Sequence, residues 1–258
     1  MSVKADPSGF PQRRLSEVRG VSTAEMRDVQ RAAQEECGLD ILQITENGGR
    51  AVAQLALAML GGKGRGRRVV VLTGGGNKGA TGMAAVRHLA NFGVAAQPVF
   101  AGVEEDISPT TRRQLQILKA SGIVEPGSLD TSEIGLEDQL AEADLLIDAL
   151  VGYGLEGPPA GIAAAVTELA VASRRPILAI DVPTGVNATT GLASHPVIRA
   201  TTTLMLDLPK KGCLEIASRG YVGELYLADL GIPVTIHERL GLQNAWIFEE
   251  GPIVRLKR

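Results

Sequence analysis

A glycine-rich segment, residues 74–82, follows a short apolar run and precedes a segment with helical spacing. Three glycines have the G-x-G-x-x-G spacing of a dinucleotide-binding turn: Gly74, Gly76 and Gly79. Glycines there let backbone N–H groups approach an anion, and the N-terminus of the next helix favours negative charge. The alternative is a plain tight turn. An ordinary dehydrogenase needs an acidic residue where the second strand ends, and residues 100–102 are Phe-Ala-Gly.

Two aspartates, Asp148 and Asp181, each lie at the end of an apolar run of the buried-strand type. Glycine turns follow both of them, at 152–157 and at 183–185. One aspartate at a strand end often caps a neighbouring helix, and that alternative stays open for each residue alone. Because the carboxyl ends of parallel strands open on one edge of a sheet, we expect one ligand site where these residues converge: Gly76, Asn77, Asp148, Gly152, Asp181 and Thr184.

Lysines follow a later apolar run, in the segment LPKKG at 208–212. Lys210 or Lys211 can reach the same edge of the sheet, although a lysine at a loop end is usually solvated. The basic, glycine-rich segment 61–68 also has two interpretations, a solvated connector or an anion-binding patch, and we favour the connector.

The elements that must position these residues alternate between strands and helices. Apolar runs predict strands at 69–72, 95–100, 145–152, 177–182, 201–206 and 224–230. Helical spacing, with a capping box at Ser22-x-x-Glu25, predicts helices at 22–38, 46–60, 80–92, 109–121 and 160–173. The alternation predicts an α/β fold, a Rossmann-like three-layer sandwich with a mainly parallel, doubly wound sheet.

The amino-acid composition and the order of segments indicate how the core and the domain are built. Of the 258 residues, 45% are apolar and only 3% aromatic, so aliphatic side chains must fill the core. Residues 1–20 are polar and predict a flexible N-terminal arm, followed by a single domain at 21–258. Residues 234–258 show no pattern that we can interpret.

Charge and cysteine content exclude several classes of protein. The net charge of the chain is −3. The chain therefore lacks the excess of positive charge that is typical of proteins that bind nucleic acids. No apolar run approaches the roughly 20 residues that span a bilayer, and the N-terminus lacks the apolar centre of a secretory signal. We therefore expect a cytoplasmic protein without a membrane partner. Cys37 and Cys213 lack metal-site spacing and are interpreted as two buried thiols.

These segments together resemble one family, the NAD(P)H-hydrate epimerases, or YjeF N-terminal domain family. The resemblance runs in order through 21–26, 46–53, the glycine loop, 86–93, 148–157, 179–191, 208–212 and 223–233. It implies a Rossmann-like sheet flanked by helices, commonly in a homodimer. It also implies epimerisation of the hydrated nicotinamide ring of damaged NADH or NADPH, NAD(P)HX. A potassium ion near the substrate is implied, and no redox cofactor.

The resemblance also implies residue roles. Asp181 matches an aspartate that contacts the substrate, and Lys210 matches the lysine of the family's Pro-Lys motif. We expect both to be catalytic, with Asp181 as the acid or base. Asp181 also belongs to the implied substrate-binding set, whose other members lie in the glycine loop and in the loop that matches the family's phosphate loop: Gly76, Asn77, Lys78, Gly79, Ala80, Thr81, Gly152, Tyr153, Gly154, Leu155, Glu156, Gly157 and Pro158.

The glycine loop departs from the family at two positions. The family usually has GNNGGDG, whereas this chain has GNKGATG. Lys78 stands where the family has an asparagine at the potassium ion, and Thr81 replaces an aspartate that lines the substrate site. Asp148 and Thr184 match two further potassium ligands. We hypothesise that the Lys78 ammonium replaces the ion by donating to Asp148 and Thr184. The alternative is that Lys78 points to solvent or to a ligand phosphate.

Three functions remain open, of which we favour the first, an epimerase. The second is a family member that has lost this chemistry and serves as a nucleotide-type ligand-binding or scaffolding domain, which Lys78 and Thr81 would favour. The third is an enzyme with another nucleotide-like substrate, such as NAD. These three functions can be distinguished by incubating the protein with one epimer of hydrated NADPH and following the loss of stereochemical purity.

Overall fold

A sheet of eight strands forms the centre of the part of the chain that the computed structural model describes, residues 9–102, 107–124, 135–154, 157–242 and 247–258. The strand order is β1-β8-β7-β6-β5-β4-β2-β3. Neighbouring strands are parallel except β7 and β8. The strands are β1 (Gln12–Arg14), β2 (Arg68–Thr73), β3 (Ala95–Phe100), β4 (Leu145–Ala149), β5 (Ile177–Ile180), β6 (Thr202–Leu206), β7 (Glu224–Ala228) and β8 (Ile253–Lys257).

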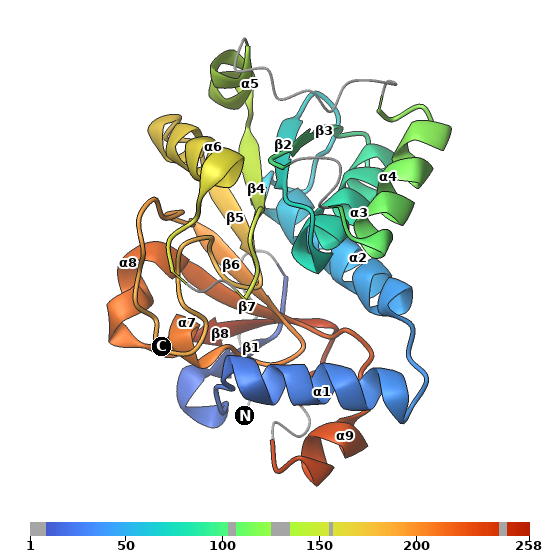
Figure 1. Cartoon of the computed structure of the whole chain (residues 1–258), viewed down its shortest axis with the longest axis vertical. Helices are drawn as coiled ribbons and strands as arrows, with labels where there is room; N and C mark the ends of the chain where they lie inside the picture. The colour runs from blue at the N-terminus through green and yellow to red at the C-terminus, as the bar shows by residue number, and fades with distance from the viewer. Residues whose placement is uncertain (1–8, 103–106, 125–134, 155–156, 243–246) are drawn as a thin grey trace.

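Helices cover both faces of this sheet (Figure 1). α2, α3 and α4 pack on one face, and α5 and α6 pack on the other. The longer helices are α1 (Thr23–Glu35), α2 (Ile41–Met59), α3 (Asn77–Asn91), α4 (Pro109–Ala120) and α6 (Gly161–Ala172). The shorter ones are α5 (Leu136–Glu142), α7 (Lys211–Leu214), α8 (Arg219–Val222) and α9 (Val234–Arg239), with single 3-10 turns at Leu15–Glu17 and Ile216–Ser218. The predicted three-layer α/β fold is confirmed.

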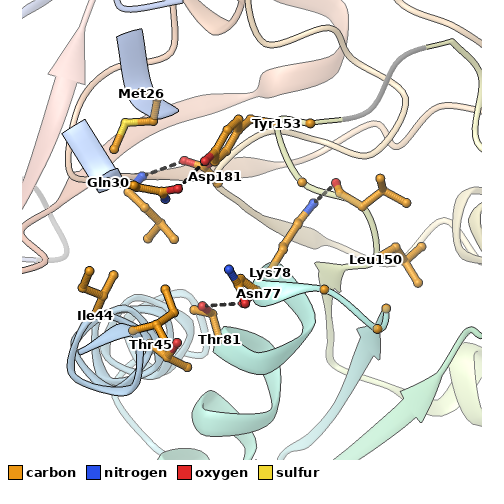
Figure 2. A pocket seen from close by; sticks show the side chains of 18 of the residues that line it. Met26, Gln30, Ile44, Thr45, Asn77, Lys78, Thr81, Leu150, Tyr153 and Asp181 are labelled. Atoms are coloured by element: carbon orange, nitrogen blue, oxygen red, sulfur yellow. Dashed lines mark hydrogen bonds between the residues drawn. The ribbon is translucent and has the colours of Figure 1, made fainter. Parts of the chain in front are cut away.

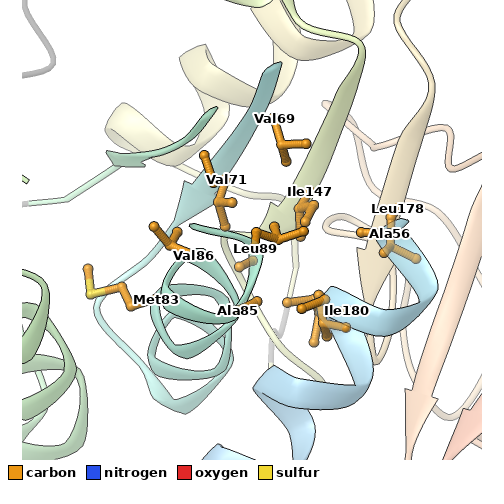
Figure 3. Close-up of a cluster of buried hydrophobic side chains, with 14 of the residues drawn as sticks. Ala56, Val69, Val71, Met83, Ala85, Val86, Leu89, Ile147, Leu178 and Ile180 are labelled. Carbon is orange, nitrogen blue, oxygen red and sulfur yellow. The ribbon is translucent and has the colours of Figure 1, made fainter. Parts of the chain in front are cut away.

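Strand side chains alternate between the two helical layers. Val69 and Val71 of β2 join the core beneath α2 and α3, whereas Val70 and Leu72 join the core beneath α5 and α6. Figure 3 shows the first of these cores, in which Val71 and Leu89 lie between the sheet and α3. Each such aliphatic side chain contributes about 1.5–3 kcal/mol when fully buried. Burial on both faces explains why the strands appear as continuous apolar runs in the sequence.

The chain reverses its direction of winding between β2 and β4. From β2 it crosses through α3 to β3 at one edge, and it then returns to form β4 on the other side of β2. The loops after β2 and β4 therefore run away from each other. In open α/β sheets this divergence creates the crevice in which ligands bind.

Helix starts follow their capping residues. α1 begins with the predicted capping box: the Ser22 N–H donates to Glu25 Oε2 at 2.7 Å, and the Glu25 N–H donates to Ser22 Oγ at 3.3 Å. α2 begins at Ile41, five residues before the predicted start, because Asp40 accepts a hydrogen bond from the Leu42 N–H at 2.7 Å. The predicted start was too late although the first turn contains the apolar residues Ile41, Leu42 and Ile44.

The N-terminal segment corrects one expectation. In the described part of residues 1–20, Gln12–Arg14 is not a loose arm but forms β1, which pairs with β8 at the sheet edge. Phe10 anchors this segment by edge-to-face contact with Tyr226, with ring centroids 6.0 Å apart. β8 comes from the tail that carried no interpretable pattern. A single domain over 21–258 stays a prediction.

Candidate functional site

A cavity of about 550 Å³ opens at the C-terminal edge of the parallel strands. Its walls come from the loops after β2, β4, β5 and β6, closed on the far side by α1 and the start of α2. Figure 2 shows Asn77, Thr81, Tyr153 and Asp181 around this space, facing Met26 and Ile44 across it. The volume lies in the range of small-molecule sites, roughly 300–1,000 Å³.

The glycine loop after β2 is shaped by close backbone contacts. A Cβ on Gly74 would lie 2.0 Å from Leu150 O, and one on Gly79 would lie 1.8 Å from Gly74 O, so both positions exclude side chains. Gly76 differs, because a Cβ there would have no neighbour within 4 Å. It precedes the first residue of α3 and lines the cavity. Gly74 and Gly79 therefore allow the backbone of the turn to pack closely, whereas Gly76 leaves open space beside the cavity.

The start of α4 holds the glycine loop in place. The Ser108 N–H donates to Gly75 O at 2.9 Å, and Thr111 Oγ1 donates to Gly76 O at 2.9 Å. The first N–H groups of α3 lie beside the cavity and have no partner within the helix. An anion is the ligand that such a helix start favours.

Asp181 and Lys210 form a buried ion pair in the cavity wall. Lys210 Nζ lies 2.6 Å from Asp181 Oδ1 and also donates to Leu206 O. The Leu206 N–H donates to the same Oδ1 at 3.0 Å. Asp181 has a φ of 65°, a left-handed conformation that is uncommon outside glycine and turns this residue out of the line of β5. Both contacts recorded for the described chain fall on Oδ1, so Oδ2 is the oxygen left for a ligand.

Lys78 is a buried residue of the cavity wall and does not point to solvent. Its Nζ donates to Asp148 Oδ2 at 3.0 Å, Val151 O at 3.0 Å, Val182 O at 2.8 Å and Thr184 Oγ1 at 3.3 Å. The side chain is 5% exposed. Burial lowers the pKa of Lys78 from its usual value, and the negative charge of Asp148 opposes that shift. Figure 2 shows the side chain extending from the start of α3, with one of its hydrogen bonds drawn as a dashed line.

Asp148 is fully buried and fully hydrogen-bonded. Its Oδ1 accepts from Thr184 Oγ1 at 2.7 Å and from the Leu150 N–H at 3.1 Å, and its Oδ2 accepts from the Thr184 N–H at 2.8 Å as well as from Lys78. Neither Asp148 nor Thr184 lines the cavity. The two residues instead hold Lys78 and join the loops after β4 and β5.

Tyr153 bridges the loop after β4 to α1. Its hydroxyl donates to Gln30 Oε1, and its ring lines the cavity. Burial, together with the negative charge of Asp181, raises the pKa of Tyr153 to about 12. The phenol is therefore a proton donor in hydrogen bonds at neutral pH and not a base.

The predicted site residues fall into three groups. The cavity wall contains Gly76, Asn77, Lys78, Thr81, Gly152, Tyr153, Gly154, Asp181 and Lys210. Outside the wall lie Gly79 and Ala80 inside α3, Asp148 and Thr184 beneath it, and the exposed Gly157 and Pro158. Leu155 and Glu156 lie outside the described residues. The structure thus brings together the ends of β2, β4 and β5 as the strand pattern predicts.

Residues of α1 and α2 escaped the sequence reasoning. Met26, Gln30, Ile44 and Thr45 line the cavity opposite the strand ends. They lie on helices that precede the first strand of the alternating unit, so the rule that ligands bind at strand ends does not find them. The family resemblance at 21–26 and 46–53 was the signal that these helices matter.

The described residues contain no group of three or more His, Cys, Asp or Glu side chains arranged to hold a metal ion. None of the helices found there has both the length and the apolar character needed to cross a bilayer.

Comparison with known proteins places this cavity in context. The model of a family described as YjeF-related protein N-terminus matches residues 42–212. The NAD(P)H-hydrate epimerase of Dehalogenimonas lykanthroporepellens is 40% identical to the chain over 239 residues, which cover 92% of each protein. The bifunctional NAD(P)H-hydrate repair enzyme Nnr of Moorella thermoacetica is 32% identical over 83% of this chain, but the chain spans only 40% of that enzyme.

A solved structure has the same fold. The crystal structure of yeast ynu0 superposes with a TM-score of 0.79 at 24% identity, covering 93% of this chain and 100% of the yeast chain. At this identity the likeness concerns the fold alone.

Proposed function

The chain belongs to the family of YjeF-related protein N-termini, and from this premise we propose that it is an isomerase that epimerises hydrated NADH and NADPH. The relative with 40% identity carries the name NAD(P)H-hydrate epimerase. The observation that carries the proposal is the Asp181–Lys210 pair in the wall of the cavity, beside the start of α3. A carboxylate for proton transfer and a helix start for phosphate are the two features that this substrate requires.

The reaction inverts the ring carbon that bears the hydroxyl group and adjoins the ring nitrogen. The nitrogen lone pair forms a carbon–nitrogen double bond, and the hydroxyl group leaves as water with a proton from solvent. A carboxylate then takes a proton from the water that adds to the opposite face, and it releases that proton to solvent. One water is lost and one is gained, and no electrons are transferred overall, so the proposed reaction needs no redox cofactor.

Asp181 is the residue we assign to this proton transfer. The contacts that the described residues make with this carboxylate fall on Oδ1, which leaves Oδ2 for the substrate, and the residue lines the cavity. Lys210 fixes Oδ1 and supplies the opposite charge. Positioning matters because a general acid or base acts only within hydrogen-bond distance of the reacting proton.

The nucleotide portion is assigned to the loops after β2 and β4. Gly76 offers open space at the N-terminus of α3, where a phosphate would meet unpaired N–H groups. Gly152 and Gly154 line the same cavity on the opposite loop. Two glycine-containing loops that face each other let a pyrophosphate approach the backbone closely.

The test uses the purified chain and one epimer of NADPHX. The proportion of the two epimers is followed by chromatography against a sample without protein, which measures any interconversion that the protein does not cause. We expect the protein to bring the mixture to equilibrium many-fold faster. If the protein binds NADPHX but does not accelerate its epimerisation, the proposed enzymatic activity is refuted and a ligand-binding role is favoured. A homodimer and a cytoplasmic location, both expected from the sequence, stay predictions.

A further inference from the structure

Among the described residues, the hydrogen-bond acceptors of the Lys78 ammonium are all oxygen atoms. The four nearest acceptors are two main-chain carbonyls, a carboxylate and a hydroxyl, all 2.8–3.3 Å from Nζ: Val182 O, Val151 O, Asp148 Oδ2 and Thr184 Oγ1. A neutral amine would direct its lone pair at one of these acceptors, whereas an ammonium has donors only. The arrangement therefore suits a positive charge.

The same oxygens are what an alkali metal ion requires. Carbonyl, carboxylate and hydroxyl oxygens replace the hydration shell of such ions in proteins. The family resemblance implies a potassium ion, and Asp148 and Thr184 are two of its matched ligands. With Lys78 present, however, the residues do not fit a resident ion, because Nζ already takes these oxygens. A second cation about 4 Å away would lose roughly a thousandfold in affinity at an effective dielectric constant near 20.

We propose that Lys78 is a tethered monovalent cation, which makes this protein independent of potassium and leaves a latent alkali-metal site that appears when its side chain is removed. The proposal does not depend on the reaction assigned above, since it concerns the charge and oxygen contacts of one buried side chain. It rests on the four contacts of Nζ and on the complete burial of Asp148, whose relative exposure is 0%.

The ammonium also joins three loops. Lys78 lies in the first turn of α3, after β2. Asp148 and Val151 belong to β4 and the loop that follows it, and Val182 and Thr184 follow β5. In each loop, a residue adjacent in sequence to one of these lines the cavity wall: Asn77, Gly152 and Asp181. Lys78 is therefore a positioning residue. An ion in the same place would bind reversibly, whereas the lysine is covalently attached to the chain.

The experiment measures thermal unfolding of the full chain in potassium, sodium and choline chloride at constant total chloride. The wild-type melting temperature should be the same in all three salts. Lys78→Ala removes the ammonium and leaves space beside Asp148, so its melting temperature should fall by roughly 10 °C in choline. Potassium at about ten times its Kd should then restore about 3–6 °C, with saturation.

Two further variants separate the site from general salt effects. Lys78→Met removes the charge but fills the space, so it should be destabilised without rescue by potassium. Lys63→Ala removes an exposed lysine and should match the wild type in every salt. A saturable rise of the wild-type melting temperature with potassium overturns the proposal. So does a soluble, folded Lys78→Ala protein with no potassium response.

The wild type alone suffices if Lys78→Ala does not fold. Crystals grown in rubidium chloride should show no anomalous peak within contact of Asp148, with Lys78 in the position described here. A rubidium ion on Asp148 and Thr184, with Lys78 turned away, would overturn the proposal.

Discussion

Asp181 Oδ1 lies 2.6 Å from Lys210 Nζ, and both side chains are nearly sealed from solvent in the wall of the same cavity. The pair joins the loop after β5 to the loop after β6. Because one carboxylate oxygen is held by the lysine and by the Leu206 N–H, the other oxygen is presented in a fixed direction.

Asp181→Asn should lower kcat of the epimerisation about 10²–10⁴-fold, the usual effect of losing a positioned acid or base. The amide keeps the shape of the side chain but does not exchange a proton with the substrate. The measurement is the initial rate of epimer interconversion. Asp138→Asn, the same change at an exposed residue of α5, serves as the control and should keep the wild-type rate. Wild-type turnover by Asp181→Asn would remove this residue from the proposed mechanism.

Lys210→Met should cost about 3–5 kcal/mol of stability, because it leaves the buried Asp181 charge without its partner. It should also lower kcat, since Oδ1 is no longer held. Unfolding in urea and epimerisation rates of the two single variants and of Lys210→Met/Asp181→Asn form a double-mutant cycle. The double variant should lose much less stability than the sum of the singles. Additive losses would show that the two side chains do not act together.

Thr81→Asp should raise kcat/KM of the epimerisation. Thr81 lines the cavity near the start of α3, where its hydroxyl donates to Asn77 O at 3.1 Å and supplies no charge. A carboxylate there restores the residue typical of the family and is favoured by the nearby helix N-terminus. Thr81→Val keeps the shape without the hydroxyl and should show no gain. If Thr81→Asp also shows none, the rate of this protein is not limited by the missing carboxylate.

Gly76→Ala and Gly79→Ala should have opposite consequences. The Gly79 methyl would meet Gly74 O, so this variant should lose about 3 kcal/mol of stability or more. The Gly76 methyl meets nothing within 4 Å, so its cost should stay under about 1 kcal/mol. It would, however, enter the space assigned to phosphate and raise KM. Melting temperatures and KM values of both variants test this. An unchanged KM in Gly76→Ala would place the phosphate elsewhere.

One of the two thiols should react in the native protein. Cys37 is exposed, contrary to the expectation of two buried thiols, whereas Cys213 is buried, and burial raises its pKa to about 12. A chromogenic disulfide reagent at mildly alkaline pH should therefore titrate one thiol quickly and the second only after unfolding. Cys37→Ser should abolish the fast reaction. Fast modification of Cys213 would mean that the core around it opens readily.

The convergence of Asp148 and Asp181 was predictable because it depends on strand direction alone. Apolar runs reveal parallel strands, and parallel strands end on one edge. Their different duties were not predictable in the same way. Whether a strand-end aspartate faces the cavity, as Asp181 does, or lies beneath it, as Asp148 does, is decided by the contacts of Lys210 and Lys78.

The remaining misses have local causes. β1 is three residues long and polar, so no periodicity marks it, and it exists because β8 offers an edge. Met26 and Thr45 line the cavity from α1 and α2. The sequence pattern of these helices shows which face is apolar and buried, but it does not show which residues line a cavity. Tertiary packing brings these residues to the site, and a single sequence does not record that packing.

The pairing of β1 with β8 has a consequence for synthesis on the ribosome. β1 is the first strand of the described sheet to leave the ribosome, but its one neighbour there, β8, is the last of these strands to do so. The strands from β2 to β7 can assemble while β1 waits without a partner, and until β8 arrives the edge of β7 is open to pairing with other chains. β8 thus completes the described sheet by pairing with both β1 and β7.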